Sequence, residues 1–127
     1  MKRLFALLLG VLFLTGCGTA ASSSSYERIS QEEAAEIMAS QEDYLILDVR
    51  TPEEFAQGHI PGAVNIPNED IGTEPIEALP RKDQTLLVYC RSGNRSRQAS
   101  QKLADQGYTK VLEFGGINTW PGEIVRD

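Results

Sequence analysis

Cys90 is the residue whose type and setting most favour chemistry. It follows the apolar run 85–89 and opens a short loop, in which Arg91 and Arg95 supply two guanidinium groups before a helical pattern begins. Cationic groups and the start of a helix both stabilise a thiolate. We therefore expect a lowered pKa for this thiol and a nucleophile at neutral pH. The alternative is a small buried cysteine that only packs among apolar side chains.

A second cysteine, Cys17, follows a different kind of segment. Residues 1–3 are Met-Lys-Arg, and residues 4–14 are apolar but too few to span a bilayer, which takes about 20 residues. Residues 14–17 resemble the lipobox of bacterial lipoproteins, whose cysteine is lipidated after cleavage before it. We expect a signal peptide over 1–16, a lipidated Cys17 with a Ser-rich tether to residue 26, and an extracytoplasmic, membrane-anchored protein. An ordinary signal peptide or an uncleaved anchor is the alternative.

The net charge and the numbers of cysteine and histidine residues limit the kinds of partner that we expect. The net charge is −6, and residues 1–16 contain Lys2 and Arg3 but no acid, so the processed chain is near −8 (−6 minus 2). This balance argues against nucleic acid and against a polybasic contact with anionic lipid. One histidine and one free cysteine cannot close a zinc site, so we expect no metal and no cofactor. An unpaired thiol in an oxidising compartment is easiest to explain if its sulfur is used.

The order of helical and strand patterns predicts an α/β fold in one domain, residues 27–127. Capping boxes at Ser30 and Thr51 open two short helices, and a third helix is expected over 95–106. Strands are expected over 44–47, 63–66, 85–89 and 110–114, the last broken by Gly115-Gly116. Such alternation indicates a parallel sheet with helices on both faces. Ligands of these sheets gather at the carboxyl ends of the strands, where Asp48, Cys90 and the glycine pair fall.

Three segments resemble the single-domain rhodaneses, a family of sulfurtransferases. They are Leu47–Phe55 continued by Gly58–Pro67, the loop Cys90–Ser96, and Gly115–Trp120. The resemblance covers essentially residues 27–127 and implies a single rhodanese-like domain, a parallel five-stranded sheet with helices on both faces. We expect the protein to be a monomer.

The resemblance also implies a mechanism. Cys90 takes a sulfane sulfur from a small anionic donor such as thiosulfate, becomes a persulfide, and passes the sulfur to cyanide or a thiol. The loop is expected to bind the donor through its amides and guanidinium groups, with Asp48 and Arg50 in support. The loop residues are Arg91, Ser92, Gly93, Asn94, Arg95 and Ser96.

Two other functions stay open. A cysteine-dependent phosphatase has a related fold, but by family resemblance its loop has five residues between cysteine and arginine, whereas Cys90 and Arg95 have four between them. A persulfide carrier without turnover would need the same cysteine. We interpret His59 and Trp120 as structural, and an Asp48–Arg50 ion pair as structural in the first instance.

Overall fold

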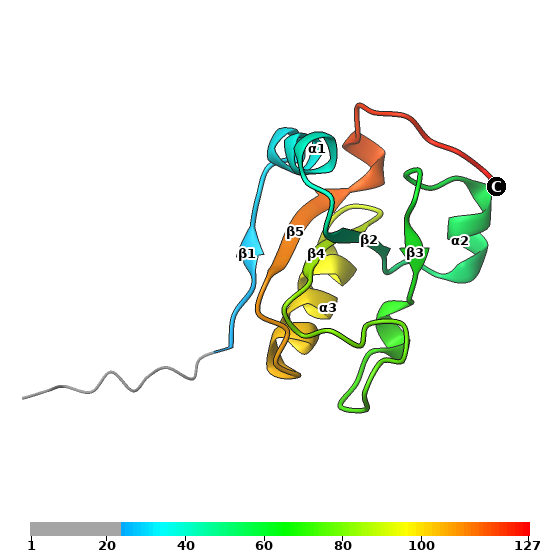
Figure 1. Cartoon of the computed structure of the whole chain (residues 1–127). Coiled ribbons are helices and arrows are strands. Elements are labelled where there is room, and N and C mark those ends of the chain that lie inside the picture. The colour runs from blue at the N-terminus through cyan, green and yellow to red at the C-terminus, as the bar shows by residue number, and fades with distance from the viewer. Residues whose placement is uncertain (1–23) are drawn as a thin grey trace, which may run out of the picture.

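The computed structural model describes residues 24–127, so Cys17 and the predicted signal peptide lie outside the described residues. The chain forms one five-stranded sheet of order β1-β5-β4-β2-β3, in which every pair is parallel (Figure 1). The strands are β1 (Glu27–Arg28), β2 (Tyr44–Asp48), β3 (Val64–Asn65), β4 (Thr85–Cys90) and β5 (Val111–Gly116). The helices are α1 (Gln31–Ser40), α2 (Pro52–Gln57) and α3 (Asn94–Asp105), with 3₁₀ turns η2 (Asn68–Asp70) and η3 (Ile117–Thr119).

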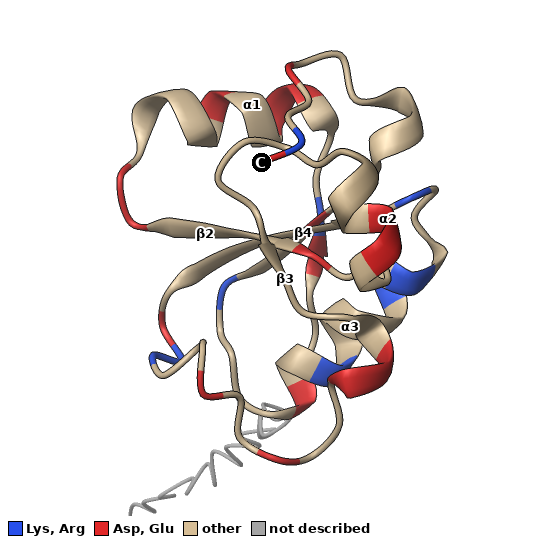
Figure 2. Cartoon of the chain, turned by 90° about the vertical axis from the view of Figure 1, so that its right-hand side faces the viewer, with Lys and Arg blue, Asp and Glu red and all other residues tan. Residues whose placement is uncertain are grey.

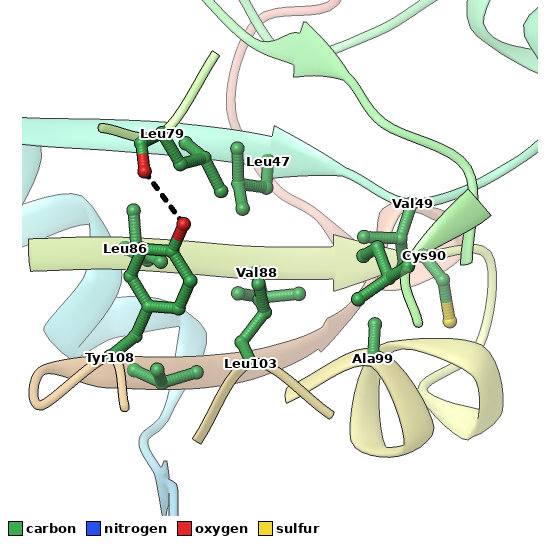
Figure 3. Packing of buried hydrophobic residues seen from close by; sticks show 11 residues of the cluster. Leu47, Val49, Leu79, Leu86, Val88, Cys90, Ala99, Leu103 and Tyr108 are labelled. Carbon is green, nitrogen blue, oxygen red and sulfur yellow. Dashed lines mark hydrogen bonds between the residues drawn. The ribbon is translucent and has the colours of Figure 1, made fainter. Parts of the chain in front are cut away.

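Helices cover both faces of the sheet, as predicted. Figure 2 shows α1 on one side of the strands and α3 on the other. Ala34 of α1 belongs to one buried cluster, and Leu103 of α3 belongs to the other. The central strands β2 and β4 are therefore covered twice, which explains their continuous apolar sequences. Figure 3 shows the α3-side cluster, with Cys90 at the end of β4.

Local hydrogen bonds fix where the helices begin. The side chains of Ser30 and Thr51 each accept a hydrogen bond from the backbone amide three residues later. The glutamate at that position accepts one in turn from the amide of the cap residue, so both predicted capping boxes are confirmed. The predicted third helix is also confirmed, with Gly107 in the left-handed region just beyond its end. None of the helices within residues 24–127 is long and apolar enough to cross a membrane.

The sheet differs from the sequence prediction at its margins. The pattern did not predict β1, because two exposed residues carry no periodicity. The prediction that Gly115-Gly116 breaks the last strand is wrong, since β5 runs through Gly116. Gly116 pairs with Cys90 after a register shift that begins at Val88. Glycine is required at position 116 because any side chain there would overlap the carbonyl group of Arg91.

Candidate active site

Cys90 ends β4 with its side chain turned into the following loop. The residue is 1 % exposed, and it is a free cysteine. Its Sγ accepts a hydrogen bond from the Gly93 amide at 3.0 Å and lies 3.4 Å from the Ser96 hydroxyl oxygen. The alternative of a cysteine that only packs does not account for these polar partners, although the same side chain also contacts the apolar cluster.

The pKa of the Cys90 thiol is lowered. Burial has the largest single effect and raises the pKa, but hydrogen bonding with the Ser96 side chain and with three loop amides outweighs it. The amides belong to Ser92, Gly93 and Ser96. The lowered pKa was expected from the sequence, but its main causes are these hydrogen bonds rather than the guanidinium groups of Arg91 and Arg95.

Gly93 lets the loop close around the sulfur. Its φ of +109° lies in the left-handed region that side chains rarely adopt, and its backbone carbonyl accepts from the Arg97 amide in the first turn of α3. The loop also needs Gly116 opposite it, where a side chain would overlap the backbone of Arg91 and Ser92. The two glycines therefore allow the loop amides to converge on the cysteine.

The two arginines differ in their availability. Arg95 forms two hydrogen bonds with the Glu54 carboxylate of α2, at 2.7 and 3.0 Å. This contact lowers the pKa of Glu54 to about 2 and raises that of Arg95. Arg91 and Asn94 are exposed at the rim of the loop. The structure thus brings the predicted loop residues together around Cys90, with the Arg95 guanidinium engaged by an internal carboxylate.

Glu113 is a site residue that the sequence analysis missed. It lies on β5 and is 1 % exposed, yet its Oε2 accepts hydrogen bonds from the Ser96 hydroxyl at 2.6 Å and the Gly115 amide at 2.9 Å. The signal available was a lone acid inside an apolar strand, two residues before a glycine pair. The carboxylate therefore lies one hydroxyl group away from the sulfur of Cys90.

Comparison with known proteins assigns the family. The family model described as Rhodanese-like domain matches residues 30–123. The chain belongs to the rhodanese-like family. A sulfurtransferase from Allochromatium vinosum is 45 % identical over 93 residues, which cover 72 % of this chain and 85 % of the relative. The thiosulfate sulfurtransferase PspE from Escherichia coli is 42 % identical over 71 residues, which cover 56 % of this chain and 68 % of the relative.

A solved structure supports the same assignment. A rhodanese-related protein from Thermoplasma volcanium superposes with a TM-score of 0.68 at 30 % identity, covering 80 % of this chain and all (100 %) of that one. The fold is therefore that of a single rhodanese-like α/β domain, and the names of the relatives support sulfur transfer at the level of the family.

Asp48 and Arg50 form a buried ion pair in this rhodanese domain. Arg50 donates to both carboxylate oxygens of Asp48, and Tyr89 donates to Oδ2 at 2.6 Å. The hydrogen bonds and charge of Asp48 raise the pKa of Arg50 although burial works to lower it. Arg50 also donates to the carbonyl of Gly58, so the pair joins β2 to the loop that follows α2. No hydrogen bond within residues 24–127 links the pair to Cys90, which is consistent with the structural interpretation.

His59 and Trp120 also hold structure together. The His59 ring stacks on Phe55 with centroids 3.7 Å apart, and its nitrogens contact the Phe55 carbonyl oxygen and Asp127. Trp120 packs against Phe114 in the α1-side cluster. No group of three metal-ligating side chains occurs in the described part of the rhodanese domain.

Proposed function

We propose that this rhodanese is an enzyme that moves a sulfane sulfur from a thiosulfate-like donor to cyanide or a thiol, through a persulfide on Cys90. Sulfur transfer is the function named for its relatives. The observation that carries the proposal is the Cys90 thiol, whose pKa is lowered by amides that converge on the sulfur. A lowered pKa increases the share of thiolate, which is the nucleophilic form, so the proposed reaction uses no general base.

In the first half of the reaction, the Cys90 thiolate attacks the outer sulfur of thiosulfate. A new S–S bond forms to Cys90, the bond within thiosulfate breaks, and its electron pair leaves with sulfite. The charge of −3 is conserved, since thiolate and thiosulfate become persulfide anion and sulfite. The loop amides then face the new terminal sulfur and stabilise its negative charge.

In the second half, the acceptor attacks this terminal sulfur. Cyanide becomes thiocyanate, or a thiolate becomes a persulfide, and the electron pair of the broken S–S bond returns to Cys90. The nucleophile is thereby regenerated, which is the pattern of a two-step covalent mechanism.

Arg95 and Arg91 are proposed to bind the anionic donor. Arg95 is bound by Glu54 in the free protein, so the donor must share this guanidinium with the carboxylate or displace it. Exposed Arg91 is free of that competition. Figure 2 shows the acidic residues of α2 close to the basic residues that precede and begin α3.

The test is intact-mass analysis of residues 24–127 before and after thiosulfate, together with thiocyanate production from thiosulfate and cyanide. We expect an adduct of about 32 Da on the wild-type protein and turnover of thiosulfate. Cys90→Ser is expected to abolish both. Activity retained by Cys90→Ser would contradict the proposal.

A persulfide carrier is the second candidate, and the near-complete burial of Cys90 favours it. At 1 % exposure the sulfur is protected from bulk acceptors, so a loaded persulfide can persist until a partner protein opens access. A carrier would show the adduct of about 32 Da without steady-state thiocyanate production.

We propose further that Cys17 is lipidated and anchors the protein outside the cytoplasm. The support is the pattern of residues 1–17 alone. Expression of the full chain in a bacterium should place it in the detergent phase after phase separation, and Cys17→Ser should move it to the aqueous phase. Unchanged partition of Cys17→Ser would contradict lipidation.

A further inference from the structure

Glu113 is a buried carboxylate that the proposed sulfur transfer does not use. Its Oε2 accepts from the Ser96 hydroxyl and the Gly115 amide, and its Oε1 lies 3.5 Å from Nε of Arg28 on β1. These donors together reach both oxygens of the carboxylate. Glu113 is also among the residues that line a surface pocket with Arg28, Ser30 and Gln31.

Ser96 has one hydroxyl proton and more than one acceptor for it. Glu113 Oε2 lies at 2.6 Å, the Gly93 carbonyl oxygen at 3.0 Å, and the Gly115 carbonyl oxygen and Cys90 Sγ each at 3.4 Å. The nearest acceptor is also the charged one, so the proton of Ser96 lies toward Glu113. The Cys90 thiol can then donate its own proton to the oxygen of Ser96.

The Cys90 thiol thus donates to the Ser96 hydroxyl, and this hydroxyl donates to the Glu113 carboxylate. Every member of this chain of hydrogen bonds is satisfied while the sulfur of Cys90 carries a proton. If the thiol ionises, Ser96 can turn its proton to the sulfur, which leaves Glu113 short of a donor. Alternatively it keeps its proton on Glu113, which leaves the thiolate with the backbone amides of the loop but without the hydroxyl donor. Two negative charges then also lie on either side of one hydroxyl group.

We propose that Glu113, acting through Ser96, is a positioning residue that disfavours the Cys90 thiolate relative to the thiol and the persulfide. The effect of Glu113 on sulfur transfer, described next, rests on the proposed persulfide chemistry. In the persulfide the Sγ atom is neutral, and the negative charge sits on the outer sulfur, one bond further from Glu113. Discharge returns the electron pair to Sγ, and a less stable thiolate is a slower leaving group. Glu113 therefore prolongs the sulfur-loaded state.

Other charged groups near Cys90 stay in place when Glu113 is changed. From α3, Arg95 interacts with the charge of Cys90 and is bound by Glu54 of α2. The guanidinium of Arg97, also on α3, lies close to Gly93 in the loop that follows Cys90. Arg28 of β1 approaches Glu113. A change at Glu113 therefore reports on this carboxylate and on its bond to Ser96.

The test titrates Cys90 by the rate of its alkylation with iodoacetamide from acid to alkaline pH. Glu113→Gln is expected to lower the midpoint by about one pH unit, a tenfold change in the ionisation constant. Ser96→Ala, which removes the hydroxyl, should shrink the effect of Glu113→Gln several-fold in the double variant. Ser100→Ala is the matched control, because Ser100 is a buried α3 serine whose hydroxyl has no partner among the described residues.

A second measurement follows the loss of the persulfide mass after addition of excess acceptor thiol. Glu113→Gln is expected to discharge several-fold faster than the wild type. If Glu113→Gln fails to fold, Glu113→Asp, which keeps the charge but draws it back from Ser96, should shift the alkylation midpoint downward by less.

Distinct outcomes overturn the inference. An unchanged or raised midpoint in Glu113→Gln contradicts it, and an equal shift with and without the Ser96 hydroxyl contradicts the route through Ser96. The alkylation titration needs no sulfur donor. Failure of the proposed sulfur transfer would therefore show as a missing persulfide while the midpoints still test the role of Glu113.

Discussion

Asp48 and Glu113 are both buried carboxylates near the carboxyl ends of strands, yet their partners differ. Asp48, on β2, accepts hydrogen bonds on both carboxylate oxygens from the guanidinium of Arg50, and further ones from the Arg50 amide and the Tyr89 hydroxyl. Glu113, on β5, receives a hydroxyl and an amide hydrogen bond and a longer contact from Arg28. The strand that ends at Cys90, β4, lies between β2 and β5, so the two acids come from the strands on either side of it.

The cation that faces each acid explains the contrast. The side chain of Arg50 is 7 % exposed and forms a dry ion pair with Asp48, whereas that of Arg28 is 67 % exposed. A buried pair cannot lose one partner without leaving an unpaired charge in a poorly hydrated site. An acid whose nearest donor is a hydroxyl can instead change its hydrogen bonding when a neighbouring group changes charge. Burial alone therefore does not distinguish a structural carboxylate from one that influences chemistry.

The largest expected effect on folding is at the first acid. Asp48→Asn removes the charge that balances buried Arg50, and we expect the free energy of unfolding to fall by about 3–5 kcal/mol. Urea denaturation measures the loss. In the protein that remains folded, the alkylation midpoint of Cys90 should stay within a few tenths of a unit of the wild type. A midpoint that moves as far as in Glu113→Gln would remove the distinction between the two acids.

Glu54 extends the comparison to a carboxylate with an intermediate environment. Its side chain is 26 % exposed, and the hydrogen bond with Arg95 lowers its pKa from 4.5 to about 2. Because the folded pKa is lowered, Glu54 stabilises the fold above about pH 4.5, and this contribution is lost as the pH falls toward 2. Glu54→Gln should cost about 1–2 kcal/mol at neutral pH, after allowance for solvent screening.

The measurement is unfolding free energy against pH for wild type and Glu54→Gln. The two curves should converge as the solution is made more acid, since protonated Glu54 and glutamine are both neutral. The same substitution frees Arg95, so the KM for thiosulfate should fall several-fold if Arg95 binds the donor. A constant gap between the stability curves would show that the Glu54–Arg95 pair does not stabilise the fold.

The second acid should matter less for folding than for chemistry. Glu113→Gln can keep an oxygen at the Oε2 position to accept from both Ser96 and Gly115, so we expect a loss of only about 1 kcal/mol in the free energy of unfolding. This is smaller than the loss in Asp48→Asn, while the order of the two variants is reversed for the alkylation midpoint of Cys90. A loss at Glu113 as large as that at Asp48 would indicate that both acids are primarily structural.

The sequence predicted the parts of this site that depend on neighbours in the chain. Capping boxes at Ser30 and Thr51, the apolar strands, and the loop from Cys90 to Ser96 all follow from patterns within a few residues. The strand pattern also placed Cys90 at the carboxyl end of a parallel strand, where the structure has it. These structural predictions were confirmed because local hydrogen bonds and burial on both faces of the sheet strongly restrict the conformation of these segments.

Contacts between residues that are far apart in the sequence could not be predicted in this way. Glu54 and Arg95 are 41 residues apart, and Ser96 and Glu113 are 17 apart. In the sequence, Arg95 is a cation beside a thiol, but in the fold a carboxylate of α2 occupies it. Glu113 lies in a strand that pairs with β4 after a register shift, and that shift has no sequence signal beyond the glycine pair. The sequence therefore indicates the proposed nucleophile, and the fold determines which groups surround it.

The smallest expected effect comes from Ser100, which lies one turn beyond Ser96 on α3. Both serines are 0 % exposed, but the Ser96 hydroxyl contacts Glu113, whereas the Ser100 hydroxyl finds no partner in residues 24–127. Removing a buried polar group without a partner does not break a hydrogen bond, and alanine favours a helix. Ser100→Ala should therefore change the free energy of unfolding by less than about 1 kcal/mol, and toward greater stability. Thermal unfolding with and without the substitution measures this. A marked destabilisation would mean that the hydroxyl has a partner, and Ser100 would then no longer serve as the neutral counterpart of Ser96.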